Sequence, residues 1–176
     1  LLYPDVNSRV LIPRELDGQR GRTVFEAVSS RRDARLYWHI DGTMNKMPIG
    51  VAVLSSHVLP TWGGNTEFCN TYAAYDMLPE EDKKLIAGLK AMHSAWTSLF
   101  YYEPEPSYAK LSEMMRIGEV ELPLVWKHRS GRNSLVLGCT AHHVIGMDPT
   151  ESTKLLVRLR DWATQPQYLY RHEWQE

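Results

Sequence analysis

Short β-prone stretches that alternate irregularly with short helical stretches are the feature that most constrains the fold of this chain. Residues 36–41, 49–56 and 122–137 are rich in aromatic and aliphatic residues and are separated by turn signals. Their order lacks the regular strand–helix alternation that predicts a parallel sheet. A length of 176 residues is typical of one domain that buries its own core. We therefore predict a single domain over residues 1–176, mostly β with flanking helices.

Helices are predicted where apolar residues recur at helical spacing or where a capping residue precedes a first turn. Pro79, with the acidic residues after it, predicts a helix whose apolar stripe runs from Leu85 to Met92. Asp148 and Pro149 predict the N-cap and first position of another helix. The remaining predictions are short helices over 73–78 and 108–115, a core strand over 49–56, a strand over 66–70, a loop over 93–106, a hairpin turn over 130–133 and a strand over 168–174.

Composition argues against several classes of protein. Lys plus Arg is 20 and Asp plus Glu is 21, so the net charge of -1 argues against a surface built to hold nucleic acid. Apolar runs fall well short of the roughly 18 residues that span a bilayer, so no membrane partner is expected. Cys69 and Cys139 carry no CxxC spacing, which favours a reducing, cytoplasmic location over a disulfide framework.

His39-Ile40-Asp41 is the first candidate for chemistry. Residues i and i+2 of an extended backbone point to one side, so the imidazole of His39 and the carboxylate of Asp41 converge. Such a pair, joined by a distant histidine, forms the facial triad of non-haem Fe(II) oxygenases and leaves positions open for a co-substrate and O2. By itself the tripeptide also fits a histidine at the end of a strand that bonds a neighbouring carboxylate.

His142-His143 is the second candidate. Adjacent strand residues point to opposite faces, so we expect at most one of the two to reach a given pocket. A single pocket histidine also fits a structural role. One of these histidines could join His39 and Asp41 around Zn2+ and give a hydrolase, because open zinc sites also use three nitrogen and oxygen ligands.

Further blocks place the His39-x-Asp41 motif in a long ordered pattern. They are residues 60–70 (PTWGGNTEFCN), 73–79 (AAYDMLP), 131–135 (GRNSL), 141–146 (AHHVIG) and 163–174 (ATQPQYLYRHEW). The pattern resembles the taurine dioxygenase family of Fe(II)/2-oxoglutarate-dependent oxygenases. From residue 131 onward it is most similar to the branch that contains 2,4-dichlorophenoxyacetate dioxygenase.

The resemblance implies a fold and a site. The fold is the double-stranded β-helix, a jelly-roll with helices packed outside. His39 and Asp41 match the first two iron ligands, and Thr66 matches the hydroxyl that helps to hold the distal carboxylate of 2-oxoglutarate. His143 matches a histidine near the substrate pocket, while Thr140 replaces a histidine of that branch. Fe(II) is then the expected metal and 2-oxoglutarate the expected co-substrate.

The implied reaction hydroxylates a small organic acid with O2 and releases succinate and CO2. A small organic anion is the expected substrate, and a homo-oligomer is compatible with the sequence. In the family, the second iron histidine and the arginine that pairs with 2-oxoglutarate come after the position of Trp174, so we expect the third ligand beyond Glu176. The chain is therefore expected to be an internal fragment, truncated at both ends. The alternatives are the zinc hydrolase and a non-catalytic β-helix domain that binds a partner or a small acid.

Overall fold

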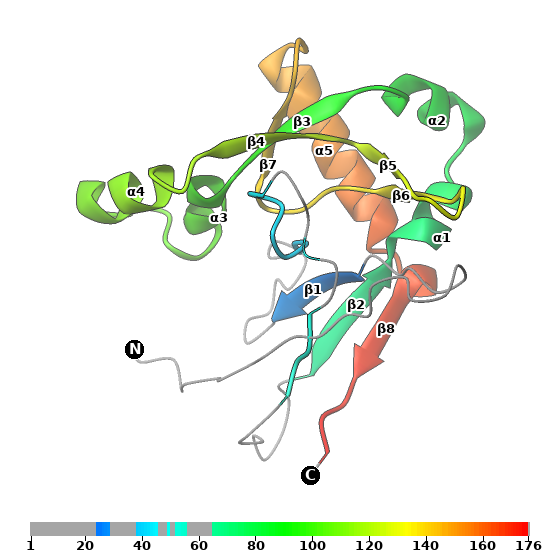
Figure 1. Ribbon diagram of the computed structural model, residues 1–176, viewed down its shortest axis with the longest axis horizontal. Helices are drawn as coiled ribbons and strands as arrows, with labels where there is room; N and C mark the ends of the chain where they lie inside the picture. The colour runs from blue at the N-terminus through cyan, green and yellow to red at the C-terminus, as the bar shows by residue number, and fades with distance from the viewer. Residues whose placement is uncertain (1–23, 29–37, 46–48, 50–51, 56–64, 176) are drawn as a thin grey trace.

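The structure is a computed structural model that describes residues 24–28, 38–45, 49, 52–55 and 65–175. Strands and helices follow one another in an irregular order (Figure 1). The strands are β1 Val24–Val28, β2 Thr66–Asn70, β3 Lys90–Ser94, β4 Glu119–Pro123, β5 Val125–Lys127, β6 Asn133–Leu135, β7 Ala141–Val144 and β8 Leu169–His172. The helices are α1 Thr71–Asp76, α2 Glu80–Ile86, α3 Ala95–Tyr102, α4 Tyr108–Met115, α5 Pro149–Ala163 and the 3-10 helix η2 Pro166–Tyr168.

The strands that the structure describes pair in an antiparallel manner. One sheet has the order β1-β2-β8, a second has the order β4-β3-β7, and β5 forms a hairpin with β6. In β2, Thr66 lies opposite Val28 on one side and His172 on the other. In Figure 1, α5 runs beside β7 toward α1, and the β1-β2-β8 sheet leads to the C-terminal end of the chain. The predicted mixture of strands and helices, without a parallel sheet in this part of the chain, is confirmed.

One hydrophobic core joins both three-stranded sheets to helix α5. Leu155 and Leu159 lie one turn apart on α5, and both are buried beside Val144 of β7. Trp38 belongs to the same cluster, so the core also fixes the segment that carries His39. The other buried members are Cys69, Ala74, Leu78, Ile86, Ala91, Leu124, Leu135, Leu137, Ala163 and Tyr168.

Predictions that rest on local signals are confirmed. The Asp148 carboxylate accepts hydrogen bonds from the N–H groups of Thr150 and Glu151, at 2.9 and 3.1 Å, and so caps α5. The predicted turn over 130–133 connects β5 to β6, and the predicted strands over 66–70 and 168–174 correspond to β2 and β8. Each of these signals is contained within a few residues, and none depends on a distant partner.

The predicted helix over 79–92 is too long. Helix α2 ends at Ile86, and Gly88 has a φ of +81°, in the left-handed region that stops a helix. Leu89 follows this stop, and Met92 lies on strand β3. Apolar residues at helical spacing therefore belong to two elements here, because both elements turn apolar side chains toward one core.

The predicted loop over 93–106 is also wrong. Strand β3 continues to Ser94, and helix α3 follows at once. Helix α3 is rich in aromatic and β-branched residues of modest helix propensity, and it forms because packing holds Leu99 fully buried. In the segment predicted as a core strand, residues 49 and 52–55 have no assigned strand, although Ala52 is buried.

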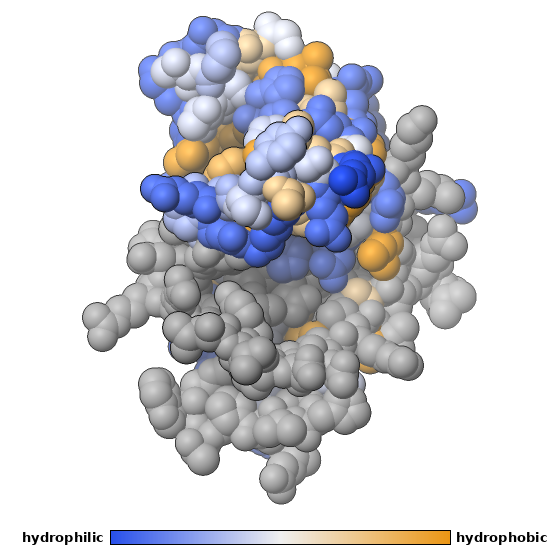
Figure 2. Space-filling view, turned by 90° about the vertical axis from the view of Figure 1, so that its left-hand side faces the viewer, coloured by the Kyte–Doolittle hydropathy of each residue, from blue (hydrophilic) through white to orange (hydrophobic). Residues whose placement is uncertain are grey.

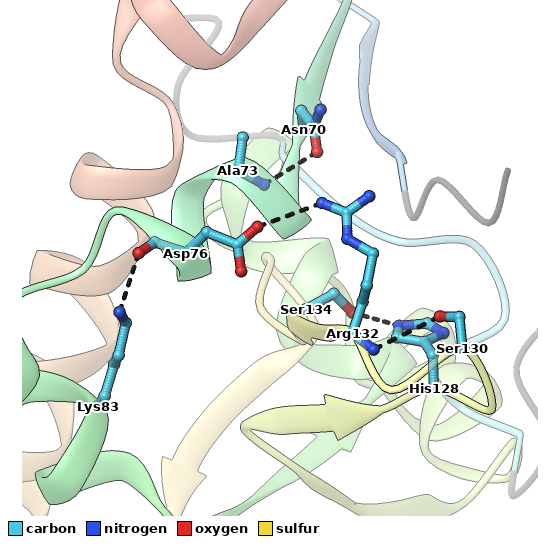
Figure 3. Close-up of polar contacts among 8 residues, drawn as sticks. All are labelled: Asn70, Ala73, Asp76, Lys83, His128, Ser130, Arg132 and Ser134. Atoms are coloured by element: carbon cyan, nitrogen blue, oxygen red, sulfur yellow. Dashed lines mark hydrogen bonds and ion pairs between the residues drawn. The ribbon is translucent and has the colours of Figure 1, made fainter. Parts of the chain in front are cut away.

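Polar contacts attach the β5–β6 hairpin to helix α1 (Figure 3). Arg132 donates a hydrogen bond to the Asp76 carboxylate at 3.3 Å, and its guanidinium lies 4.3 Å from the centre of the Tyr72 ring. His128 Nε2 and Ser134 Oγ lie 2.8 Å apart across the turn. The hairpin is thereby fastened to α1.

The described surface has a mixed character at the end formed by α3 and α4. Figure 2 shows hydrophilic side chains there, with single hydrophobic ones between them. Tyr108, Met115 and Ile117 are exposed, which is ordinary for isolated apolar residues. Among the residues described, no helix is both long enough and apolar enough to cross a membrane.

We expect Asp148→Ala to lower the free energy of unfolding by about 1 kcal/mol, because the first turn of α5 loses its acceptor. Urea denaturation followed by circular dichroism measures the change. Asp161→Ala is the matched control on the same helix, where an exposed carboxylate bonds the adjacent Arg160. It should change the free energy by less than about 0.5 kcal/mol. Equal losses in the two variants would contradict the capping role.

Candidate metal centre

His39 and Asp41 lie where an extended segment enters a turn, and their side chains converge. His39 Nε2 and Asp41 Oδ1 are 3.2 Å apart. The His39 side chain is 29% exposed and that of Asp41 is 39% exposed, so both remain accessible. The backbone turns over residues 41–44, with the N–H of Asn45 donating to the carbonyl of Gly42 at 2.9 Å. The convergence expected from i, i+2 spacing is therefore observed.

Gly42 is required by the geometry of this turn. Its φ of +76° lies in the left-handed region, which side chains disfavour. A Cβ at this position would lie 2.6 Å from Cγ1 of Ile49, which is too close for carbon atoms that are not bonded. A residue with a side chain would therefore displace the turn that carries Asp41.

The two side chains suit a divalent metal ion. A hydrogen bond from His39 lowers the pKa of Asp41, against the opposing effect of burial, so the carboxylate is anionic at neutral pH. The anionic carboxylate and the neutral imidazole are the forms that bind metals. Two ligand atoms at right angles around one ion, each about 2.1 Å away, are separated by about 3.0 Å. The observed 3.2 Å is close to that separation.

Within the parts of the chain that the structure describes, no group of three or more His, Cys, Asp or Glu side chains could hold a metal ion. His142, His143 and His172 thus do not complete a three-ligand site with His39 and Asp41. Burial raises the pKa of the Cys139 thiol to about 12, so this cysteine is not a thiolate ligand. Among the described residues, His39 and Asp41 therefore lie together without a third candidate ligand, and the zinc ligand set considered above is not assembled.

Thr66 is the first residue of β2 and is buried. Its hydroxyl oxygen accepts a hydrogen bond from Nε1 of Trp174 at 3.0 Å. A hydroxyl that accepts one bond still has its own hydrogen to donate. This side chain is therefore able to donate to a carboxylate. The two glycines that precede it in the motif, at 63 and 64, lie outside the described residues.

His142 and His143 do not point to opposite faces, which corrects the expectation from strand geometry. Met92 of β3 pairs with His143, but His93 pairs with Ala141, so His142 is the extra residue of a β-bulge. The bulge brings the two Nδ1 atoms to 2.9 Å, with ring centres 4.5 Å apart. Simple alternation fails because one extra residue shifts the register within β7.

Two residues beside this histidine pair carried no sequence signal. The Trp96 ring centre lies 5.2 Å from that of His142, and its Nε1 donates to Glu119 at 2.9 Å. Glu119 Oε1 lies 3.4 Å from His142 Nε2. Burial and His143 lower the pKa of His142, while Glu119 acts in the opposite direction. Trp96 and Glu119 come from α3 and β4, and β3 brings these elements together.

Sequence analysis also missed a buried polar group behind the candidate metal centre. His93 of β3 is fully buried, with its Nδ1 2.9 Å from Oγ1 of Thr140. Thr140 Oγ1 in turn lies 2.9 Å from Oγ1 of Thr43, two residues after Asp41. Desolvation, with a smaller effect from His142, lowers the pKa of His93 to about 4. His93 is therefore neutral at physiological pH.

A family model described as "Taurine catabolism dioxygenase TauD, TfdA family" matches residues 9–176. The chain belongs to this family. It is 40% identical over 142 residues to the alpha-ketoglutarate-dependent 2,4-dichlorophenoxyacetate dioxygenase of Burkholderia sp. (strain RASC). That match covers 80% of this chain and 47% of the relative.

The chain is also 38% identical over 142 residues to the (S)-phenoxypropionate/alpha-ketoglutarate-dioxygenase of Sphingobium herbicidovorans. This second match covers 78% of the present chain and 50% of the relative. The chain thus spans about half the length of the curated relatives it matches.

Two solved structures are also similar to this chain. The crystal structure of AAD-2 in complex with Mn(II) and N-oxalylglycine is similar with a TM-score of 0.71 and 33% identity. The similarity covers 80% of this chain and 56% of that one. A putative alpha-ketoglutarate dependent 2,4-D dioxygenase from Burkholderia xenovorans is similar with a TM-score of 0.66 and 31% identity, over 80% and 54% of the two chains. The chain has the fold of part of these proteins.

We expect His93 to make the free energy of unfolding fall as the pH decreases from about 6.5 to 4. Between these pH values His93 binds a proton in the unfolded protein and not in the folded one. This difference lowers the free energy of unfolding by up to about 1.4 kcal/mol for each pH unit of the decrease. Urea denaturation of wild type and His93→Asn at a series of pH values measures this contribution. The wild-type slope should exceed that of the variant, and equal slopes would contradict the burial of a neutral His93.

Proposed function

We propose that this chain is part of an Fe(II)- and 2-oxoglutarate-dependent dioxygenase that hydroxylates a small organic anion. The 3.2 Å spacing of His39 Nε2 and Asp41 Oδ1, in a chain of the TauD/TfdA family, carries the proposal. We further propose that residues 1–176 belong to one oxygenase domain with a double-stranded β-helix fold. The antiparallel sheets that flank the 38–45 segment support that architecture.

His39 and Asp41 are the proposed protein ligands of the iron. The bound metal with 2-oxoglutarate supplies the activation of O2: substrate C–H, O2 and 2-oxoglutarate give C–OH, succinate and CO2. The two side chains would hold the ion from one side and would leave positions for the co-substrate and O2. A third ligand would come from outside the described residues, which provide none beside His39 and Asp41.

Thr66 is the proposed donor to the distal carboxylate of 2-oxoglutarate. It is buried, and its hydroxyl is oriented by the indole of Trp174. A hydrogen bond to a charged group inside a protein is worth more than a neutral one. A buried hydroxyl cannot balance a carboxylate charge by itself, so an arginine of the kind that the family resemblance implies would carry most of that task.

His143 is the proposed substrate residue. It is half-buried and lies against His142, whose ring packs at a tilted angle against Trp96. Imidazole N–H groups donate to anions, and an aromatic ring beside them suits an organic substrate with an apolar part. The relatives named above act on phenoxyacetate and phenoxypropionate compounds, which combine a carboxylate with an aromatic ring. We propose a substrate of this general chemistry for the present protein.

Anaerobic addition of Fe(II) and then 2-oxoglutarate to the protein expressed from its complete coding sequence tests the metal centre. We expect a visible charge-transfer band that is lost in His39→Ala and Asp41→Ala, because each removes a ligand while circular dichroism stays native. His172→Ala is the control, since His172 lies on β8 and belongs to no three-ligand group in the described chain. A band that persists in both ligand variants would refute the assignment. Turnover with Zn2+ in place of Fe(II), without 2-oxoglutarate, would favour the hydrolase.

We expect Thr66→Val to raise the dissociation constant of 2-oxoglutarate about 10- to 100-fold, because valine cannot donate a hydrogen bond to the charged carboxylate. Thr66→Ser keeps the hydroxyl and should stay within about threefold of wild type. Titration of the same visible band with 2-oxoglutarate measures both constants. Equal affinities of the valine and serine variants would show that the hydroxyl does not bind the co-substrate.

A further inference from the structure

A chain of buried hydrogen bonds ends on the peptide between His39 and Asp41. His93 Nδ1 lies 2.9 Å from Thr140 Oγ1, which lies 2.9 Å from Thr43 Oγ1. Thr43 Oγ1 in turn donates to the carbonyl of Ile40 at 3.1 Å. The three side chains are 0%, 5% and 0% exposed, so the bonds of Thr140 to His93 and Thr43 are shielded from water. Elements far apart in the sequence are thus joined at the backbone of the candidate metal centre.

The direction of each hydrogen bond in this series follows from the number of hydrogens that each group can donate. The Ile40 carbonyl can only accept, so the single hydroxyl hydrogen of Thr43 is used there. Thr43 must therefore accept from Thr140, and Thr140 must accept from His93 Nδ1–H. Nε2 of His93 then carries a lone pair, and it has no hydrogen-bond partner among the residues described. This tautomer avoids an unpaired buried N–H, which is the rarer and costlier defect.

Thr140, the middle residue of this hydrogen-bonded series, is held in place by its neighbours. Its carbonyl accepts from the N–H of Ser94 and from the hydroxyl of Thr97, both at 3.0 Å. The preceding residue, Cys139, donates its N–H to the carbonyl of Trp38 at 2.7 Å. Strand β3 and helix α3 therefore fix Thr140, and the segment that carries His39 is attached at two points to residues 139–140.

We propose that His93, Thr140 and Thr43 are positioning residues for the metal centre. Together they fix the peptide at Ile40 and, through it, the 3.2 Å spacing of His39 and Asp41. This inference rests on the proposed function, because a fixed ligand spacing matters only if His39 and Asp41 bind a metal. Groups that orient metal ligands without touching the metal typically change metal affinity 10- to 100-fold when they are removed.

The test measures Mn(II) affinity by electron paramagnetic resonance on the protein expressed from its complete coding sequence. Thr140→Val removes the hydroxyl and keeps the side-chain volume, whereas Thr140→Ser keeps the hydroxyl. We expect about a 10-fold or larger loss of affinity in the valine variant and less than about a threefold loss in the serine variant. His93→Asn, which keeps an N–H donor near the position of Nδ1, should bind Mn(II) more tightly than His93→Leu.

Ser134→Ala controls for general destabilisation. It removes another buried hydroxyl, one that pairs with His128 in the β5–β6 hairpin, and should leave Mn(II) affinity unchanged. Urea midpoints of all variants show whether the folds are comparable. If Thr140→Val does not fold, Thr43→Val and Thr43→Ser provide the same comparison one bond closer to the metal centre.

The outcomes separate this proposal from the proposed function. Wild-type Mn(II) binding that is lost in His39→Ala but undiminished in the valine variants would overturn the positioning role alone. Equal losses in the valine and serine variants would also overturn it, because the hydroxyl would then not be the operative group. Absence of Mn(II) binding by wild type would overturn both proposals.

Discussion

The attachment of residues 38–43 to residues 139–140 is the constraint on which the candidate metal centre depends. A backbone hydrogen bond of 2.7 Å joins Cys139 to Trp38, and a side-chain hydrogen bond of 2.9 Å joins Thr140 to Thr43. The two threonines are 97 positions apart in the sequence, so the contact closes a long loop at an entropic cost. Burial of Trp38 in the core offsets part of that cost. The turn that carries His39 and Asp41 is thereby held by the core rather than by its own short sequence.

Strand β3 supports both the candidate metal centre and the His142–His143 pair. His93 and Ser94 hold Thr140 and through it the turn of Asp41. Strand β3 also pairs with β7 across the bulge that brings His142 and His143 together. Buried polar groups are stabilising only when they are paired, and here their pairing also fixes the geometry of the metal centre. A neutral His93 is consistent with this arrangement, since its low pKa follows from the same burial.

Family membership and local geometry contribute different parts of the functional argument. The match over residues 9–176 identifies the family, and the matched part of the chain covers 47% of the Burkholderia relative. The described geometry adds a histidine–carboxylate pair whose spacing suits one metal ion, and a buried threonine with a hydrogen to donate. The oxygenase proposal therefore rests on residues that can be tested one at a time. The proposed positioning role of His93, Thr140 and Thr43 depends on contacts that this fold creates.

Local chemistry made part of this protein predictable from sequence. Asp148 caps its helix through N–H groups two and three residues away, and the i, i+2 spacing brings His39 and Asp41 together. Such features involve neighbours along the chain, so the residue types and their order determine them. The motif blocks, in their order, likewise indicate the family from sequence.

Other features of the fold depend on tertiary structure. Helix α3 forms because Leu99 is buried, although local propensity did not favour a helix there. Helix α2 ends at Ile86, before Gly88, and Met92 pairs within the sheet, although the apolar spacing predicted a longer helix. The bulge at His142 and the His93–Thr140–Thr43 hydrogen bonds depend on strand pairing between residues about 50 to 100 positions apart. Pairing of this kind is set by the packing of a whole sheet against a common core, which no short stretch of sequence encodes.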